Sequence, residues 1–393
     1  MLVSLALMLL LGFGLSGVFK HFNLPGLIGM ILAGIILGPY MFDMISPSLL
    51  EVSTELRQIA LIVILLRAGL SLDIQDLIKI GRPAFLMSFL PAVFEIGMVI
   101  IIAPMILNIT LLDAAILGSV LAAVSPAVVV PRMLHLIHEG YGYKHRIPQI
   151  VMAGASLDDI FVIILFTSFV SLRQGQAVDL SLFLTLPVSI LTGIGFGFFV
   201  GWVFVILFKR IHMRDTIKVL LILSVSFLLL GLEHSISSFI PYSALLSVIS
   251  IGLSILYFYP KLANRITSKF SKIWVASEVF LFILVGAVVN LTSLQSYAWL
   301  IALVLVLGLV SRLIGVQMCL IKSNLTPKER LFTGVAYLPK ATVQAAIGSI
   351  PLSLGFSSGN IILAAAVLAI LISAPLGAYG IDTLTTKLLV KDR

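Results

Sequence analysis

Charged side chains are scarce in this sequence, and cysteine is almost absent. Charged residues make up 11% of the 393 residues and hydrophobic residues 60%, whereas soluble domains carry about 25% charged residues. The composition excludes an ordinary soluble protein and predicts an all-α polytopic membrane protein. The one cysteine, Cys319, excludes an internal disulfide. No linker or low-complexity tract interrupts the chain, so we interpret residues 1–393 as a single integral membrane domain.

A positively charged start is also missing. The first apolar run, residues 2–19, has no Lys or Arg before it, although secretory signal peptides begin with a positive segment. Its first cation, Lys20, follows the run. We therefore expect a retained first membrane helix rather than a cleaved signal.

Long apolar runs recur along the whole chain. Each is about 16–28 residues long, and about 20 residues are needed to cross a bilayer as a helix. The runs are too long for barrel strands and do not alternate apolar and polar residues. We predict thirteen membrane helices. They cover residues 2–19, 25–41, 55–72, 83–107, 111–134, 147–172, 181–208, 216–232, 239–258, 273–290, 295–321, 329–352 and 359–386.

The basic residues are distributed unevenly between the predicted loops. When alternate loops are assigned to alternate sides, twenty of the 25 Lys and Arg residues fall on one side and two on the other. The remaining three, Arg67, Arg312 and Lys340, lie within apolar segments. Lys and Arg collect in cytoplasmic loops, so the bias predicts an N-terminus outside the cell and a C-terminus in the cytoplasm. It also accounts for the net charge of +8 without nucleic acid as a partner.

Three acidic residues lie deep in the apolar segments. They are Glu95, Asp158 and Asp159, and the last two are adjacent in the middle of the run 147–172. A charge at bilayer depth opposes insertion by at least ~2.5–3.5 kcal/mol, so such a residue indicates a functional site.

Two segments have the pattern of interrupted helices. The first carries Pro126 and Pro131 at its middle, and the second carries Pro339 followed by Lys340. Proline removes a backbone donor and clashes with the preceding turn. Non-helical backbone at membrane depth persists only where it is buried in protein or lines a water-filled cavity. We therefore expect a break in each segment.

The two predicted breaks lie seven segments apart, as do Glu95 and Arg312. An odd offset inverts the second copy, which predicts inverted repeats, each with one broken helix. Secondary transporters with inverted repeats bind their substrates near the midplane, at discontinuous helices.

The acidic pair has two interpretations. Ser156 with Asp159 resembles a capping box that would start a helix, but the remaining helix would be short for a bilayer. The alternative is a cation site in which Asp158 and Asp159 bind either a hard cation or protons, since hard cations take oxygen ligands. We expect Ser125, Thr342, Gln344 and carbonyls freed at the breaks to complete it.

The buried cations need acidic partners, because buried charges are tolerated when paired. We assign Arg312 to a structural ion pair with Glu95, and pairing of Arg312 with Asp158 stays open. Lys340 is expected to neutralise an acid of the site or to oppose the helix dipoles at the breaks. Glycines in the run 181–208 are expected to serve helix packing alone.

Four motifs resemble those of the cation:proton antiporter superfamily. They are RAGLSLD at 67–73, AAVSPAVVVP at 122–131, GASLDDI at 154–160 and AYLPKATVQAAIGS at 336–349. They are most similar to the NHA-type sodium/proton antiporters of animals and their bacterial relatives, over most of the chain.

The resemblance implies a homodimer whose core domain moves like an elevator against a dimerisation domain. It implies a core at about 83–172 and 295–386 and a scaffold at about 1–72 and 181–290. It also implies that the two crossed broken helices are those at Pro126 and Pro339, and that Asp158 and Asp159 bind the ion and the protons. Electrogenic bacterial members carry a lysine where this chain has Arg312, so both electrogenic and electroneutral exchange stay open.

We predict a Na⁺(Li⁺)/H⁺ antiporter of the cell membrane that needs no cofactor, acts in pH homeostasis and is not an enzyme. A K⁺/H⁺ antiporter of the same fold is the nearest alternative. An intramembrane aspartyl protease is disfavoured, because its acids stand on separate helices and no Gly-x-Gly-Asp motif occurs here. A channel or ion sensor is disfavoured by the paired breaks.

Overall fold

The computed structural model describes residues 1–71, 81–175, 180–233, 240 and 242–391. Three predictions extend beyond these residues: the end of the motif 67–73, the end of the run 55–72 and the start of the run 239–258. Within the described part the chain is helical, and its only β-type contact is an isolated bridge between Tyr141 and Lys391.

The chain forms two compact units. The first comprises Met1–Val52, Asp73–Val170 and Leu281–Arg393, and the second comprises Ser53–Leu72 and Ser171–Phe280. The first unit contains α1 (Leu2–His21), α2 (Gly26–Leu37), α3 (Pro47–Glu51), α6 (Arg82–Met87), α7 (Leu90–Leu107), α8 (Leu111–Ala122), α9 (Pro126–Glu139), most of α10 (Ile147–Gln174), α16 (Leu291–Cys319), α17 (Pro327–Ala336), α18 (Thr342–Ile347), α19 (Ile350–Ser353) and α20 (Gly359–Leu388). The second contains α4 (Ser53–Ser71), α11 (Leu180–Arg210), α12 (Asp215–Gly231), α14 (Ala244–Phe258) and most of α15 (Pro260–Ala287).

Eight spans in the described part of the chain are long and apolar enough to cross a membrane, and two shorter apolar helices, α2 and α14, accompany them. The predicted number of thirteen is therefore not confirmed. Part of the difference comes from broken segments: the run 329–352 divides into α17, α18 and α19, none of which has the length of a span.

Two further predicted runs differ clearly from the structure. The run 273–290 begins earlier, because α15 starts at Pro260. Leu262, Ile266 and Phe270 are fully buried at helical spacing in that extension, so one apolar face continues among cations that lower the local hydropathy. The run 83–107 is divided into α6 and α7 at Ser88 and Phe89.

In the second unit, α11 packs closely on α14 through glycines. A Cβ added at Gly193 or Gly197 would collide with the carbonyl of Ser243 or Ser247, respectively. The Ser247 hydroxyl donates to the carbonyl of Gly193 at 2.7 Å. Missing Cβ atoms allow such close approach between membrane helices, which agrees with the predicted packing role of these glycines.

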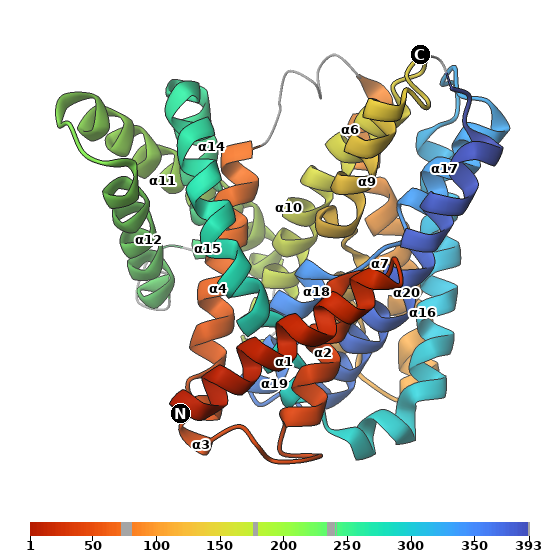
Figure 1. The fold of residues 1–393 in the computed structure, drawn as a ribbon, viewed down its shortest axis with the longest axis horizontal. Helices are drawn as coiled ribbons and strands as arrows, with labels where there is room; N and C mark the ends of the chain where they lie inside the picture. Colours follow the sequence, from red (N-terminus) through yellow and green to blue (C-terminus); the bar gives the residue numbers. More distant parts are fainter. Residues whose placement is uncertain (72–80, 176–179, 234–239, 241, 392–393) are drawn as a thin grey trace. The chain divides into compact units, whose positions relative to one another are not determined.

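In the first unit, α7 packs along α16 (Figure 1). The Ser311 hydroxyl on α16 donates to the carbonyl of Phe94 on α7 at 2.8 Å. Gly315, one turn further along α16, lies against Pro91, whose Cα is 2.9 Å from the position of an added Cβ. This close contact places Glu95 of α7 beside Arg312 of α16.

Candidate functional site

The acidic pair lies well inside α10. The helix begins at Ile147, nine residues before Ser156, and continues to Gln174, so the capping-box interpretation of this segment is wrong. The Asp158 side chain is fully buried, whereas Asp159 is 8% exposed. The two carboxyl groups therefore sit in different surroundings on one helix.

The first predicted break lies between α8 and α9. The helix α8 ends at Ala122, residues 123–125 are not helical, and α9 begins at Pro126. The freed backbone N–H of Val124 donates to Asp158 Oδ2 at 2.8 Å. By contrast, α9 continues through Pro131, which leaves the helix unbroken at that point.

The second break lies between α17 and α18, at residues 337–341. Two of its backbone groups are satisfied by other elements: the Pro339 carbonyl accepts from the N–H of Ser125 at 2.8 Å, and the N–H of Lys340 donates to the Ser373 hydroxyl on α20 at 3.0 Å. The hydrogen bond between Ser125 and Pro339 joins the two breaks directly, so the crossed arrangement is held by backbone atoms.

The C-terminal end of α8 is neutralised by three side chains from other elements. The Lys340 ammonium donates to the Leu121 carbonyl, and the Arg312 guanidinium donates to the Ala122 carbonyl. Gln344 Nε2 donates to the Ala123 carbonyl at 2.9 Å. Cations are stabilising at this end of a helix dipole. A cation that used these carbonyls as ligands, as predicted, would have to compete with these three donors.

The buried charges form a connected network. Arg312 Nη1 is 3.0 Å from Glu95 Oε2, and Arg312 Nη2 is 2.9 Å from Asp158 Oδ2. Lys340 Nζ is 2.8 Å from Glu95 Oε1. All four of these side chains are fully buried. The two pairings considered for Arg312 from the sequence therefore occur together, since the guanidinium offers five N–H donors.

Two side chains that contribute to this network were missed in the sequence. Tyr337 accepts a hydrogen bond from Arg312 Nε through its carbonyl at 2.9 Å, and its ring centroid lies 5.3 Å from the guanidinium carbon. Ser373 supports the second break, as described above. Tyr337 lies within the motif 336–349, but an aromatic residue in an apolar run is read as packing, and a single serine in α20 gives no signal.

Five buried side-chain oxygens near the breaks and the acidic pair have no hydrogen-bond partner among the described residues. They are Ser125 Oγ, Asp158 Oδ1, Asp159 Oδ1, Thr342 Oγ1 and Gln344 Oε1. Buried polar atoms are normally satisfied, so unsatisfied ones call for an explanation such as an absent ion. Oxygen donors of this kind are those that hard cations take.

The charges of the network do not cancel when all groups are ionised. Arg312 and Lys340 contribute two positive charges, against the negative charges of Glu95, Asp158 and Asp159. The first two acids are each paired with a cation, whereas Asp159 has no ion pair among the described residues. One negative charge therefore remains, on the buried carboxyl group of Asp159.

Comparison with known proteins identifies the family of the chain. The family described as "sodium/hydrogen exchanger, transmembrane" matches residues 5–387. The chain belongs to this family. Sodium/hydrogen exchanger 9B2 of Mus musculus is 32% identical over 379 residues, which cover 94% of this chain and 69% of the relative. Sodium/hydrogen exchanger 9B1 of Homo sapiens is 32% identical over 396 residues, covering 94% and 73%.

A solved structure supports the fold. The sodium proton antiporter MjNhaP1 from Methanocaldococcus jannaschii matches with a TM-score of 0.83 at 20% identity, covering 98% of this chain and 97% of that one. The predicted antiporter fold is therefore confirmed. The chain is a multi-pass membrane protein for cation/proton antiport, a transporter rather than an enzyme, which excludes the intramembrane protease.

Proposed function

We propose that the protein exchanges Na⁺ or Li⁺ for protons by alternating access, and that Asp159 is the main cation ligand and proton carrier. The observation that carries this proposal is that Asp159 is left without a cationic partner among the described residues, while Glu95 and Asp158 are paired. A cation and a proton neutralise the same carboxylate and therefore compete for it. That competition couples the two fluxes.

The proposed ion shell consists of side-chain oxygens from three elements. Asp158 Oδ1 and Asp159 Oδ1 belong to α10, Ser125 Oγ stands at the first break, and Thr342 Oγ1 and Gln344 Oε1 follow the second. Pro126 and Pro339 contribute indirectly, because they keep the backbone non-helical at the places where these side chains begin. Side-chain oxygens replace the carbonyls at the end of α8, which already accept from Arg312, Lys340 and Gln344.

We propose one-for-one exchange on the same grounds. Arginine stays protonated in proteins, so Arg312 holds Asp158 without releasing a proton. Lys340 is engaged by Glu95. Only the charge on Asp159 then changes, and one Na⁺ or one proton brings the network to neutrality. An isolated charge is costly to move through the membrane. A site that is neutral when loaded avoids most of this free-energy cost.

The proposed moving part is the core at about 83–172 and 295–386, and the proposed scaffold is formed by about 1–72 and 181–290, in a homodimer of the cell membrane. Support comes from the site itself, since α7, α10, α16 and α18 contribute side chains to it and α8 contributes backbone carbonyls. These elements belong to one compact unit, which also includes residues 1–52 and 281–290 of the proposed scaffold. The bias of Lys and Arg supports an N-terminus outside and a C-terminus in the cytoplasm. A role in pH homeostasis follows from the proposed exchange.

The test is exchange in proteoliposomes that contain a pH-sensitive dye. Addition of Na⁺ or Li⁺ should drive proton movement with the wild type and none with Asp159→Asn. Asp113→Asn is the matched control, because Asp113 is equally buried but lies at the other end of α8. Exchange by Asp159→Asn at the wild-type rate would refute the proposed site. Movement driven by K⁺ but not by Na⁺ or Li⁺ would favour the K⁺/H⁺ antiporter.

A further inference from the structure

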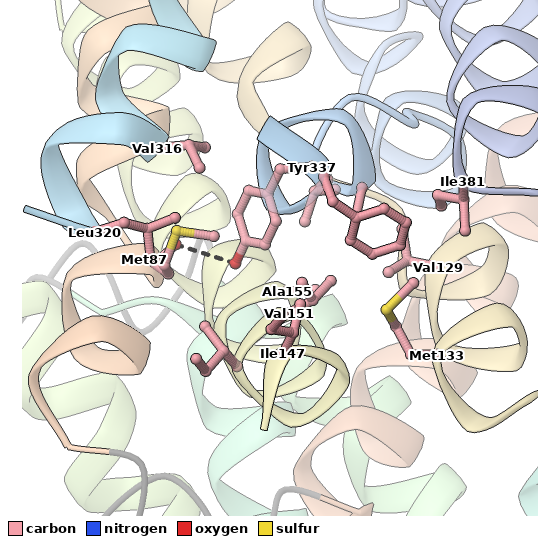
Figure 2. Packing of buried hydrophobic residues seen from close by; sticks show 14 of the residues in the cluster. Met87, Val129, Met133, Ile147, Val151, Ala155, Val316, Leu320, Tyr337 and Ile381 are labelled. Carbon is pink, nitrogen blue, oxygen red and sulfur yellow. Dashed lines mark hydrogen bonds between the residues drawn. The ribbon is translucent and has the colours of Figure 1, made fainter. Parts of the chain in front are cut away.

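Tyr337 is a buried aromatic residue directly after α17, which ends at Ala336. It is fully buried within an apolar cluster, and Figure 2 shows its ring beside Val316, Leu320 and Met87. Its hydroxyl donates to the carbonyl of Met87 at 3.1 Å. The polar group therefore has a specific partner instead of being tolerated in the cluster.

The backbone and ring of Tyr337 both contact Arg312. The Tyr337 carbonyl accepts from Nε at 2.9 Å, and the ring centroid lies 5.3 Å from the guanidinium carbon. The guanidinium is planar and rigid, so fixing Nε also fixes the directions of the two other nitrogens. Those nitrogens bind Glu95 and Asp158. The orientation of both ion pairs thus depends on contacts made by Tyr337.

The hydroxyl also connects the second break to α6 and α10. Met87 is the last residue of α6, and Gly154 precedes Asp158 by four residues on α10. A Cβ added at Gly154 would collide with the Tyr337 hydroxyl and would lie 2.8 Å from Met87 Cβ. Residues four apart share one face of a helix. The face of α10 that carries Asp158 is therefore seated against the Tyr337 hydroxyl.

We infer that Tyr337 is a positioning residue for exchange, which orients Arg312 between Glu95 and Asp158. The missing side chain of Gly154 leaves the space that the Tyr337 hydroxyl occupies. This inference rests on the proposed function, because its consequence concerns the ion site. When Arg312 is held on Asp158 Oδ2, Oδ1 of the same carboxylate stays available to a cation. When it is released, the guanidinium competes with the cation for the acidic pair.

The experiment measures the apparent KM for Na⁺, the maximal rate and the pH profile in proteoliposomes. Tyr337→Leu removes the ring from Arg312 and should raise the KM about five- to thirtyfold, the range expected when one buried cation–π contact is lost. The maximal rate should change less, because the charges of the site are unchanged. Tyr337→Phe keeps the ring and should lie near the wild type.

Substitutions at Gly154 provide a second, independent test. Gly154→Ala should raise the KM strongly, because its methyl group displaces the Tyr337 hydroxyl. Gly154→Ala combined with Tyr337→Phe removes the nearer of the two atoms with which the methyl group collides and leaves Met87 Cβ, so the KM should return part of the way to that of Tyr337→Phe. This double-mutant comparison isolates the interaction between the two residues. It remains informative even when Tyr337→Leu does not fold.

Phe332→Leu is the matched control, since Phe332 is a fully buried aromatic residue of the same cluster and of α17. It should lower the melting temperature and leave the KM and pH profile unchanged. The inference is overturned if Tyr337→Leu behaves in the same way, or if the double variant has the same KM as Gly154→Ala alone. Activity of Asp159→Asn would instead refute the proposed site, whatever the Tyr337 variants do.

Discussion

Arg312 and Lys340 donate to the same carboxylate, with 3.0 Å and 2.9 Å from their nitrogens to Glu95 Oε2. Each also donates to a carbonyl at the end of α8. The two cations therefore neutralise an acid and a helix terminus at once. Removing either of them leaves both a buried charge and a buried carbonyl with less compensation.

Replacement of Lys340 by an apolar residue should destabilise the protein. Breaking a buried ion pair by removing one partner reduces the free energy of unfolding by about 3–5 kcal/mol, so Lys340→Met should lower the melting temperature markedly in detergent. Glu95→Gln added to it restores the net charge and should recover part of the loss. A double variant as unstable as Lys340→Met would contradict the pairing.

Exchange should carry no net charge. The proposed site changes by one charge, on Asp159, and Arg312 stays protonated. An imposed membrane potential, set by a K⁺ gradient with valinomycin, should therefore leave the rate of Na⁺-driven proton movement unchanged. A rate that follows the potential would show that more than one proton is exchanged for each Na⁺.

The contact between α11 and α14 should not accept a side chain at Gly197. A Cβ there would collide with the Ser247 backbone, and overpacking typically reduces the free energy of unfolding by about 1–3 kcal/mol. Gly197→Ala should lower the melting temperature. Gly195→Ala is the control, because its Cβ would meet no described atom within 4 Å. Equal effects of the two substitutions would argue against this packing.

The ion pair between Asp215 and Arg265 should give a pH-dependent contribution to stability. Partial burial raises the pKa of Asp215, but the hydrogen bond and charge of Arg265 together with Lys218 outweigh it, so the pKa lies below the usual value. A lowered pKa stabilises the folded state above the unfolded value of about 3.9, and this contribution disappears as pH falls through the folded value.

Asp215→Asn should therefore lower the melting temperature at pH 7, and its effect should disappear as pH falls through the lowered pKa of Asp215. Asp382→Asn is a useful comparison, because the Asp382 side chain, paired with Arg132 at 3.1 Å, is 47% exposed against 23% for Asp215, and exposed pairs contribute about 0–1 kcal/mol. A difference between Asp215→Asn and wild type that grows as pH falls would contradict the assignment.

Both breaks were predictable from local chemistry, because Pro126 and Pro339 stand at mid-segment beside polar residues. The hydrogen bond between Ser125 and Pro339 was not, since it joins backbone atoms far apart in the sequence. The partners of Arg312 were predictable only as alternatives. A guanidinium with five donors satisfies two acids, and the choice depends on distances that a sequence does not contain.

Other features of the structure could not be predicted from the average hydropathy of each segment. The early start of α15 is marked by Leu262, Ile266 and Phe270 at helical spacing, but the cations between them hide it from a search for apolar runs. The positions of Tyr337 and Ser373 depend on the crossing of the two breaks. Such contacts follow from tertiary structure and leave no local pattern.

The single uncompensated charge at Asp159 also favours ions of one particular charge. A bound ion with one positive charge would bring the net charge of the five buried side chains to zero, whether it is a proton, Li⁺ or Na⁺. A divalent ion such as Ca²⁺ would leave the filled site at plus one, in surroundings where an isolated charge is strongly opposed. The proposed site should therefore discriminate against divalent ions through its charge alone, before the size of the ion has any influence.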